Sequence, residues 1–182
     1  SDQLEHLCRI IKGSGLSDDC EWSVEVAPSE ITQEKLDVLA DGGVTRISLG
    51  VQTFSSEMMK SLGRNHNVDK VFSAYSMIRQ KAAFLVNLDL IFGAPGQTLD
   101  MWDLDLMTAV ELEPDHISTY CLTFEEDTAM YIRLSEGKVE LDLDKEAEFY
   151  EKAWSLLPQF GYPQYEVSNF SKPGRACLHN LN

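Results

Sequence analysis

Four segments rich in β-branched and aromatic residues alternate with helical patterns, and this alternation restricts the chain to an α/β fold. The segments cover residues 22–27, 46–52, 86–92 and 116–123. Between them, apolar residues at helical spacing predict helices over 32–41, 68–83 and 98–112. Strand–helix–strand units of this length form right-handed crossovers, so we expect a parallel sheet. Downstream, the pattern predicts helices over 128–136 and 144–159 and a short strand over 165–170.

Each of the first three strands has one apolar face and one small or polar face. Alternate residues of a strand point to opposite faces, which places Glu25, Gln52 and Asp89 together on the polar face. A doubly wound sheet is covered by helices on both faces, and its strands are apolar throughout. A curved, barrel-like sheet fits better, because its concave face can line a cavity.

Carboxylates on an interior face need partners, since burying them unpaired costs several kcal/mol or raises their pKa values. A cationic or hydrogen-bond-rich ligand in the cavity would satisfy Glu25 and Asp89; neighbouring Arg or backbone groups are the alternative. The loop over 93–98 follows the third strand and contains two glycines, and Thr98 is placed to cap the next helix. It lacks the G-K-[ST] of a phosphate-binding P-loop.

The net charge excludes several classes of partner. With 15 Lys and Arg against 30 Asp and Glu, the 182-residue chain carries −15, which argues against binding nucleic acid or anionic lipid. Residues 111–151 hold 13 acidic and 3 basic side chains, for a net charge of −10. We interpret this stretch as the solvated face of helices and loops, with an acidic docking surface as the alternative.

Neither a membrane span nor a signal peptide is indicated by the sequence, so we expect a cytoplasmic protein. The four cysteines, Cys8, Cys20, Cys121 and Cys177, form no C-x-x-C pair. They therefore suggest free thiols and neither a disulfide framework nor a zinc site.

Several motifs together give the sequence a family resemblance. They are VEVAP (24–28), GVTRISLGVQTF (43–54), LGRNH (62–66), NLDLIFGAPGQT (87–98), ISTYCLT (117–123), YEVSNF (165–170) and HNL (179–181). With these motifs in this order, the chain resembles radical S-adenosylmethionine (SAM) proteins of the oxygen-independent coproporphyrinogen III oxidase type. That family also contains heme chaperones.

The resemblance implies an α/β fold: a truncated, partial (β/α)6 TIM-like barrel of the radical SAM type, in which the four strands are the third to sixth. Residues 1–160 would be the barrel core, incomplete at its N-terminus, and residues 161–182 the start of a C-terminal region. Five positions match family residues that contact SAM: Glu25, Gln52, Arg64, Asp89 and, less closely, Thr123.

The family's C-x-x-x-C-x-x-C motif, whose thiolates hold a 4Fe-4S cluster, is not found in this sequence and would precede Ser1. We therefore expect the chain to be a fragment that does not itself assemble the cluster or cleave SAM. The cofactors implied for the parent protein are SAM, the 4Fe-4S cluster and, in the chaperone branch, heme.

The end of the chain resembles the H-N-x-x-Y-W of the heme-chaperone branch and favours a parent protein that delivers heme to an acceptor protein. His179 is then a candidate heme ligand and Cys177 a second one; a surface or hydrogen-bonding histidine is the alternative. The second hypothesis is a true oxidase, in which a SAM-derived radical and an electron donor support decarboxylation of two propionates of a porphyrinogen. A non-redox binding module is the third.

Overall fold

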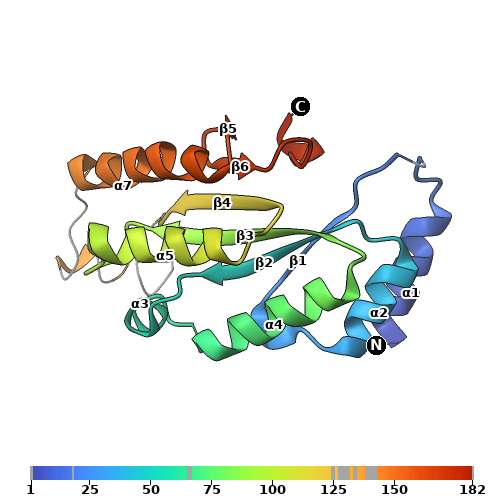
Figure 1. Cartoon of the computed structure of the whole chain (residues 1–182). Coiled ribbons are helices and arrows are strands. Elements are labelled where there is room, and N and C mark those ends of the chain that lie inside the picture. Colours follow the sequence, from blue (N-terminus) through green and yellow to red (C-terminus); the bar gives the residue numbers. More distant parts are fainter. Residues whose placement is uncertain are drawn as a thin grey trace.

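The computed structural model describes residues 2–17, 19–64, 67–123, 126, 132, 135–137 and 143–181. Its centre is a six-stranded mixed sheet of order β1-β2-β3-β4-β6-β5 (Figure 1). The first four strands are parallel: β1 (Ser23–Val26), β2 (Arg46–Gln52), β3 (Leu85–Phe92) and β4 (His116–Cys121). They confirm the four strands that the sequence predicts, and the fold is a partial barrel of the α/β class.

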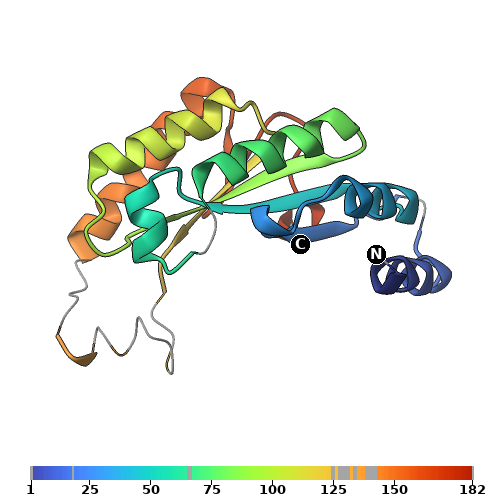
Figure 2. The same ribbon diagram turned by 90° about the horizontal axis from the view of Figure 1, so that it is seen from below.

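The helices that connect these strands also match the predictions: α2 (Gln33–Gly42), α4 (Val68–Lys81) and α5 (Leu99–Glu111). Each begins after a residue whose side chain accepts a backbone N–H, namely Thr32, Asn67 and Thr98. After α2, Gly43 has a φ of 95°, a left-handed conformation that ends a helix. Figure 2 shows α4 and α5 side by side over one face of the sheet.

Three elements differ from the sequence-based expectations. Before β1, α1 (Asp2–Gly13) packs on α2 through Cys8, and after β2 comes the short helix α3 (Ser56–Ser61). The predicted strand over 165–170 is an antiparallel hairpin of β5 (Gln164–Glu166) and β6 (Asn169–Ser171), because a turn interrupts it. Its second strand pairs with β4.

The long helix near the C-terminus is α7 (Leu143–Leu156), which continues into the 3-10 turn η2 (Leu157–Phe160). Most of the helix predicted over 128–136 lies outside the described residues. Short 3-10 turns also follow β1 (η1, Pro28–Glu30) and close the described chain (η3, Leu178–Leu181). Among the described helices, none is both long and apolar enough to cross a membrane.

The apolar face of the sheet forms the core, as the alternation of the strands predicts. Its side chains are fully buried on β2 and β3: Ile47, Leu49, Val51, Leu88, Leu90 and Phe92. On the other face, Glu25 is exposed, and Ser48, Gln52 and Asp89 are only partly buried. The sheet is therefore packed under helices on one side and open to a ligand on the other.

Trp102 joins two of the covering helices. Its indole lies 5.3 Å from the ring of Phe92, centroid to centroid, and its Nε1 donates to the carbonyl of Phe149 on α7 at 3.0 Å. Because Trp102 is fully buried, this hydrogen bond lies in the core, where a lost partner is costly.

Trp102→Phe should lower the free energy of unfolding by about 1–3 kcal/mol, through a small cavity and the lost hydrogen bond. Urea unfolding at pH 7 measures it. Trp154→Phe is the matched control, since that indole donates to the Val167 carbonyl at 3.2 Å but is 42% exposed. Equal losses in both variants would contradict the role given to Trp102.

Candidate functional site

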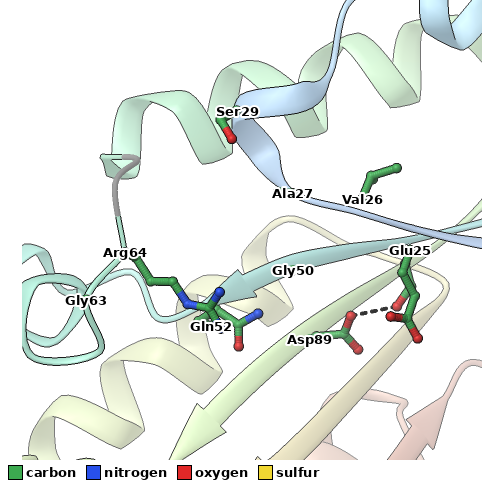
Figure 3. A pocket seen from close by; sticks show the side chains of 10 residues that line it. Glu25, Val26, Ala27, Ser29, Gly50, Gln52, Gly63, Arg64 and Asp89 are labelled. Carbon is green, nitrogen blue, oxygen red and sulfur yellow. Dashed lines mark hydrogen bonds between the residues drawn. The ribbon is translucent and has the colours of Figure 1, made fainter. Parts of the chain in front are cut away.

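A pocket of about 410 Å³ lies on the polar face, near the carboxyl ends of β1, β2 and β3 (Figure 3). Parallel α/β folds bind ligands at this end of their strands. Its lining includes Glu25 from β1, Gln52 from β2, Asp89 from β3 and Arg64 from the loop after α3. Four of the five residues assigned to SAM in the sequence analysis therefore share one pocket.

Asp89 is held by neighbours on its own sheet. Ser48 Oγ donates to its Oδ2 and Asn87 Nδ2 to its Oδ1, both at 2.7 Å. Burial raises the pKa of Asp89, while these hydrogen bonds and one from Ser118 lower it, and the charge of Glu25 raises it. The result is a carboxyl group with a pKa above its ordinary value, fixed in position beside a second carboxylate.

Gln52 is aimed by an irregularity at the end of β2. The register between β2 and β3 shifts between Leu49 and Gln52, and Gln52 has a φ of 70°, which is rare for a residue other than glycine. The next two residues hold this conformation: Thr53 Oγ1 donates to Asp105 Oδ2 at 2.7 Å, and the Phe54 N–H donates to Asp105 Oδ1 at 2.6 Å.

Asp105 comes from α5 and is 1% exposed, so its carboxylate is desolvated. That burial raises its pKa to about 6, against the smaller opposing effect of the Thr53 and Phe54 hydrogen bonds. The Asp105 carboxylate thus fixes the backbone that follows Gln52, and in doing so it loses contact with water.

Two glycines give the pocket its shape. At Gly50, an added Cβ would lie 3.0 Å from Gln52 Nε2, so the absence of a side chain leaves room for the amide of Gln52. Gly63 has a φ of 67° in the turn that follows α3 and precedes Arg64. The Arg64 N–H donates to the Met59 carbonyl at 2.9 Å, and Figure 3 shows the guanidinium extending toward Gln52.

The remaining two predicted residues lie elsewhere. Thr123 lines a separate hollow of about 510 Å³ beyond the end of β4, together with Tyr120, Cys121 and Tyr150. His179 is exposed on η3 in the C-terminal segment, which we define as residues 172–181. The structure therefore does not bring Thr123 or His179 into the pocket with the other four.

The C-terminal segment is tied to the start of β2 by Arg46, whose side chain is almost fully buried. Arg46 Nη2 donates to Glu21 Oε2 at 2.7 Å and to the carbonyls of Arg175 and Ala176 at 3.0 and 3.1 Å. Glu21 Oε1 in turn accepts from Cys177 Sγ at 3.0 Å. Burial, followed by this hydrogen bond to Glu21, raises the pKa of the Cys177 thiol.

A cluster site does not appear among the described residues, where no three His, Cys, Asp or Glu side chains gather as metal ligands. All four cysteines lie in described segments and are free: Cys8 is buried, Cys20 exposed, and Cys121 and Cys177 partly buried. The described part of the chain therefore does not fit a 4Fe-4S cluster.

Sequence reasoning missed Asp105, although a signal was present. On α5 the buried positions are Trp102, Asp105, Leu106 and Ala109, so a charged residue interrupts an apolar helical stripe. The sequence analysis also did not identify His116, and it identified Arg64 only through the family resemblance.

Comparison with known proteins agrees with this fold. The family model of the radical SAM superfamily matches residues 2–107, more than half of the sequence. The chain therefore belongs to the radical SAM superfamily.

Among curated proteins, it is similar to those named heme chaperone HemW. Identity is 38% to HemW of Bacillus subtilis, over 98% of this chain and 47% of that protein, and 38% to HemW of Escherichia coli, over 92% and 43%. The chain thus spans less than half the length of these relatives.

Among solved structures, the chain is similar to coproporphyrinogen III oxidase (HemN) from Escherichia coli, a radical SAM enzyme. The TM-score is 0.80 at 26% identity, over 95% of this chain and 40% of that one. Methylornithine synthase (PylB) shares the fold, with a TM-score of 0.62 at 15% identity, over 83% of this chain and 43% of the other.

Asp105→Asn should change how stability depends on pH. The pKa of Asp105 is raised from 3.8 to about 6 in the folded protein, so the folded state binds the proton more tightly. Stability therefore increases as the pH falls through this window. Between pH 7 and pH 4, wild type should gain about 2 kcal/mol relative to Asp105→Asn.

Urea unfolding at several pH values measures this difference. Asp100→Asn is the control, because Asp100 is an exposed acid on the first turn of the same helix. A difference between wild type and Asp105→Asn that stays constant with pH would show that Asp105 is not perturbed.

Proposed function

We propose that the pocket binds SAM and that the parent protein acts in heme metabolism, most simply as a heme chaperone. The observation that carries the proposal is the convergence of Glu25, Gln52, Arg64 and Asp89 in one pocket of a radical SAM chain. These four come from three strands and a loop, and their separation along the sequence reaches 64 residues, from 25 to 89.

The chemistry of the pocket suits SAM. The ligand carries positive sulfonium and ammonium groups, a negative carboxylate and two ribose hydroxyls. Glu25 and Asp89 can accept hydrogen bonds from hydroxyl and ammonium groups, Arg64 can pair with the carboxylate, and the Gln52 amide can both donate and accept. The volume of about 410 Å³ lies in the range of small-ligand sites.

Membership in the superfamily implies a 4Fe-4S cluster in the parent protein, where it supplies the electron for reductive cleavage of SAM. The described residues contain no ligand set for it. We therefore assign to this chain only the binding and orientation of SAM, together with the partners that the parent's function requires: heme or a porphyrinogen, an electron donor and a heme acceptor.

The relatives named as heme chaperones favour that function over the oxidase. The C-terminal segment supports it chemically, because His179 is exposed and a neutral imidazole is a good ligand for heme iron. Cys177 suits the role less well, since its thiol is bonded to Glu21 and kept protonated by its raised pKa. The likeness to HemN keeps the oxidase as the second candidate.

SAM binding by this chain is testable with two substitutions in the pocket. Glu25→Gln should weaken binding about fivefold or more, since a charge-assisted hydrogen bond becomes a neutral one. Gly50→Val should weaken it further, because the new side chain displaces the Gln52 amide. Titration with SAM, followed by ¹H–¹⁵N NMR, gives both the affinity and the residues perturbed.

Glu30→Gln is the matched control, because Glu30 is an exposed acid five residues along the same segment and lies outside the pocket, paired with Lys35 at 2.8 Å. SAM-induced shifts that avoid residues 25, 50 and 89, or equal affinities for all three variants, would rule out this pocket as the SAM site.

The choice between chaperone and oxidase needs the parent protein with its cluster reconstituted anaerobically. The chaperone predicts a heme absorbance band without turnover of coproporphyrinogen III, and loss of most of that band in His179→Ala. His6→Ala is the control, since His6 is exposed on α1. Release of 5′-deoxyadenosine with decarboxylation of the porphyrinogen would instead establish the oxidase.

A further inference from the structure

A row of hydrogen-bonded side chains leads from the pocket to the C-terminal segment. Asp89 Oδ1 accepts from Asn87 Nδ2 at 2.7 Å, and Asn87 Oδ1 lies 2.6 Å from His116 Nδ1. His116 Nε2 lies 2.6 Å from the hydroxyl of Tyr165. That hydroxyl accepts the backbone N–H of Cys177 at 3.2 Å.

The hydrogen-bond partners of each side chain determine which atoms donate and which accept. Asn87 Nδ2 donates to Asp89 and also to Ser48 Oγ at 2.6 Å, so Asn87 Oδ1 is the acceptor for His116. His116 therefore carries its proton on Nδ1, and its Nε2 accepts from Tyr165. The Tyr165 hydroxyl donates to the imidazole, and its lone pairs accept from Cys177 N and Asn180 Nδ2.

This arrangement needs a neutral imidazole, and the surroundings of His116 provide one. The ring is 1% exposed, and burial lowers its pKa to about 4; the charge of Arg46 lowers it as well and that of Glu21 raises it. The Tyr165 ring also packs edge-on against it, at 5.5 Å between centroids and an interplanar angle of 72°.

The two ends of the row contact different parts of the molecule. At one end Asp89 faces the pocket, and at the other Tyr165 holds Cys177 and Asn180, the residues on either side of Leu178 and His179. A rotation of the Asn87 amide would exchange its donor for its acceptor. It would then break the bonds to both Asp89 and His116, so the two ends are not independent.

We propose that His116 and Tyr165 are positioning residues that couple the orientation of Asp89 in the pocket to the order of residues 177–180. The proposal deepens the proposed function, because it links the SAM pocket to the segment with the candidate heme ligand. The coupling itself does not depend on either ligand. Since coupling between sites is reciprocal, a change at either end alters the other.

Asp89→Ala tests the coupling without any ligand. Hydrogen exchange of the Cys177 amide, measured by NMR, should accelerate about fivefold or more, the lower end of typical coupling between sites. The ¹⁵N shifts of the His116 ring should also move away from those of the pure Nδ1–H tautomer. The effect crosses three intervening side chains, since Asp89 reaches Cys177 through Asn87, His116 and Tyr165.

Glu25→Ala is the matched control, because it also removes a carboxylate of the pocket but lies outside the row. Asp89→Asn serves as the second variant if the alanine change prevents folding. The proposal is overturned if Cys177 exchange and the His116 ring nitrogens in the Asp89 variants are the same as in wild type and Glu25→Ala.

The reverse direction is tested with Tyr165→Phe. The control is Tyr162→Phe, which removes a buried tyrosine hydroxyl that donates to the Pro114 carbonyl at 2.9 Å. Tyr165→Phe should raise the pKa of Asp89, read from its carboxyl ¹³C shift, and lower SAM affinity about fivefold; Tyr162→Phe should change neither. Wild-type protein that binds no SAM would overturn the proposed function alone, while an Asp89 pKa unchanged by Tyr165→Phe would overturn the coupling alone.

Discussion

The partly buried carboxyl group of Asp89 needs hydrogen-bond donors from the polar face of the sheet. Desolvation raises its pKa, and Ser48 and Asn87 offset that cost by donating to both of its oxygens. Those donors come from β2 and β3, and Asn87 is in turn fixed by His116 on β4. One partly buried carboxyl group therefore organises polar side chains on three strands.

The irregular end of β2 directs the side chain of Gln52 into the pocket. The bulge and the positive φ of Gln52 change the direction of the chain, and Asp105 on α5 accepts two hydrogen bonds from the residues that follow. A helix on the covered face thus controls a side chain on the open face. This contact explains why a charged residue sits in the apolar stripe of α5.

Much of the fold was predictable, because the relevant signals are local. Strand-forming segments identified β1 to β4, the two-residue alternation gave the faces of the first three, and Thr98 marked the start of α5. The helix α1 was missed although Leu4, Cys8 and Ile11 have helical spacing and point inward. The hairpin of β5 and β6 was read as one strand, because its turn lies within a short segment that satisfies strand preferences throughout.

The sequence by itself determined that Glu25 and Asp89 lie on the polar faces of their strands, since alternate residues of a strand point to opposite faces. Gln52 was expected on the same face, but its orientation also depends on the irregularity at the end of β2. The meeting of these three residues with Arg64 in one pocket, and the separate places of Thr123 and His179, were decided by the tertiary structure. So were the carboxylate of Asp105 behind Gln52 and the row from Asp89 to Tyr165. These contacts join residues dozens of positions apart, and no local pattern records them, because they form only when strands and helices pack.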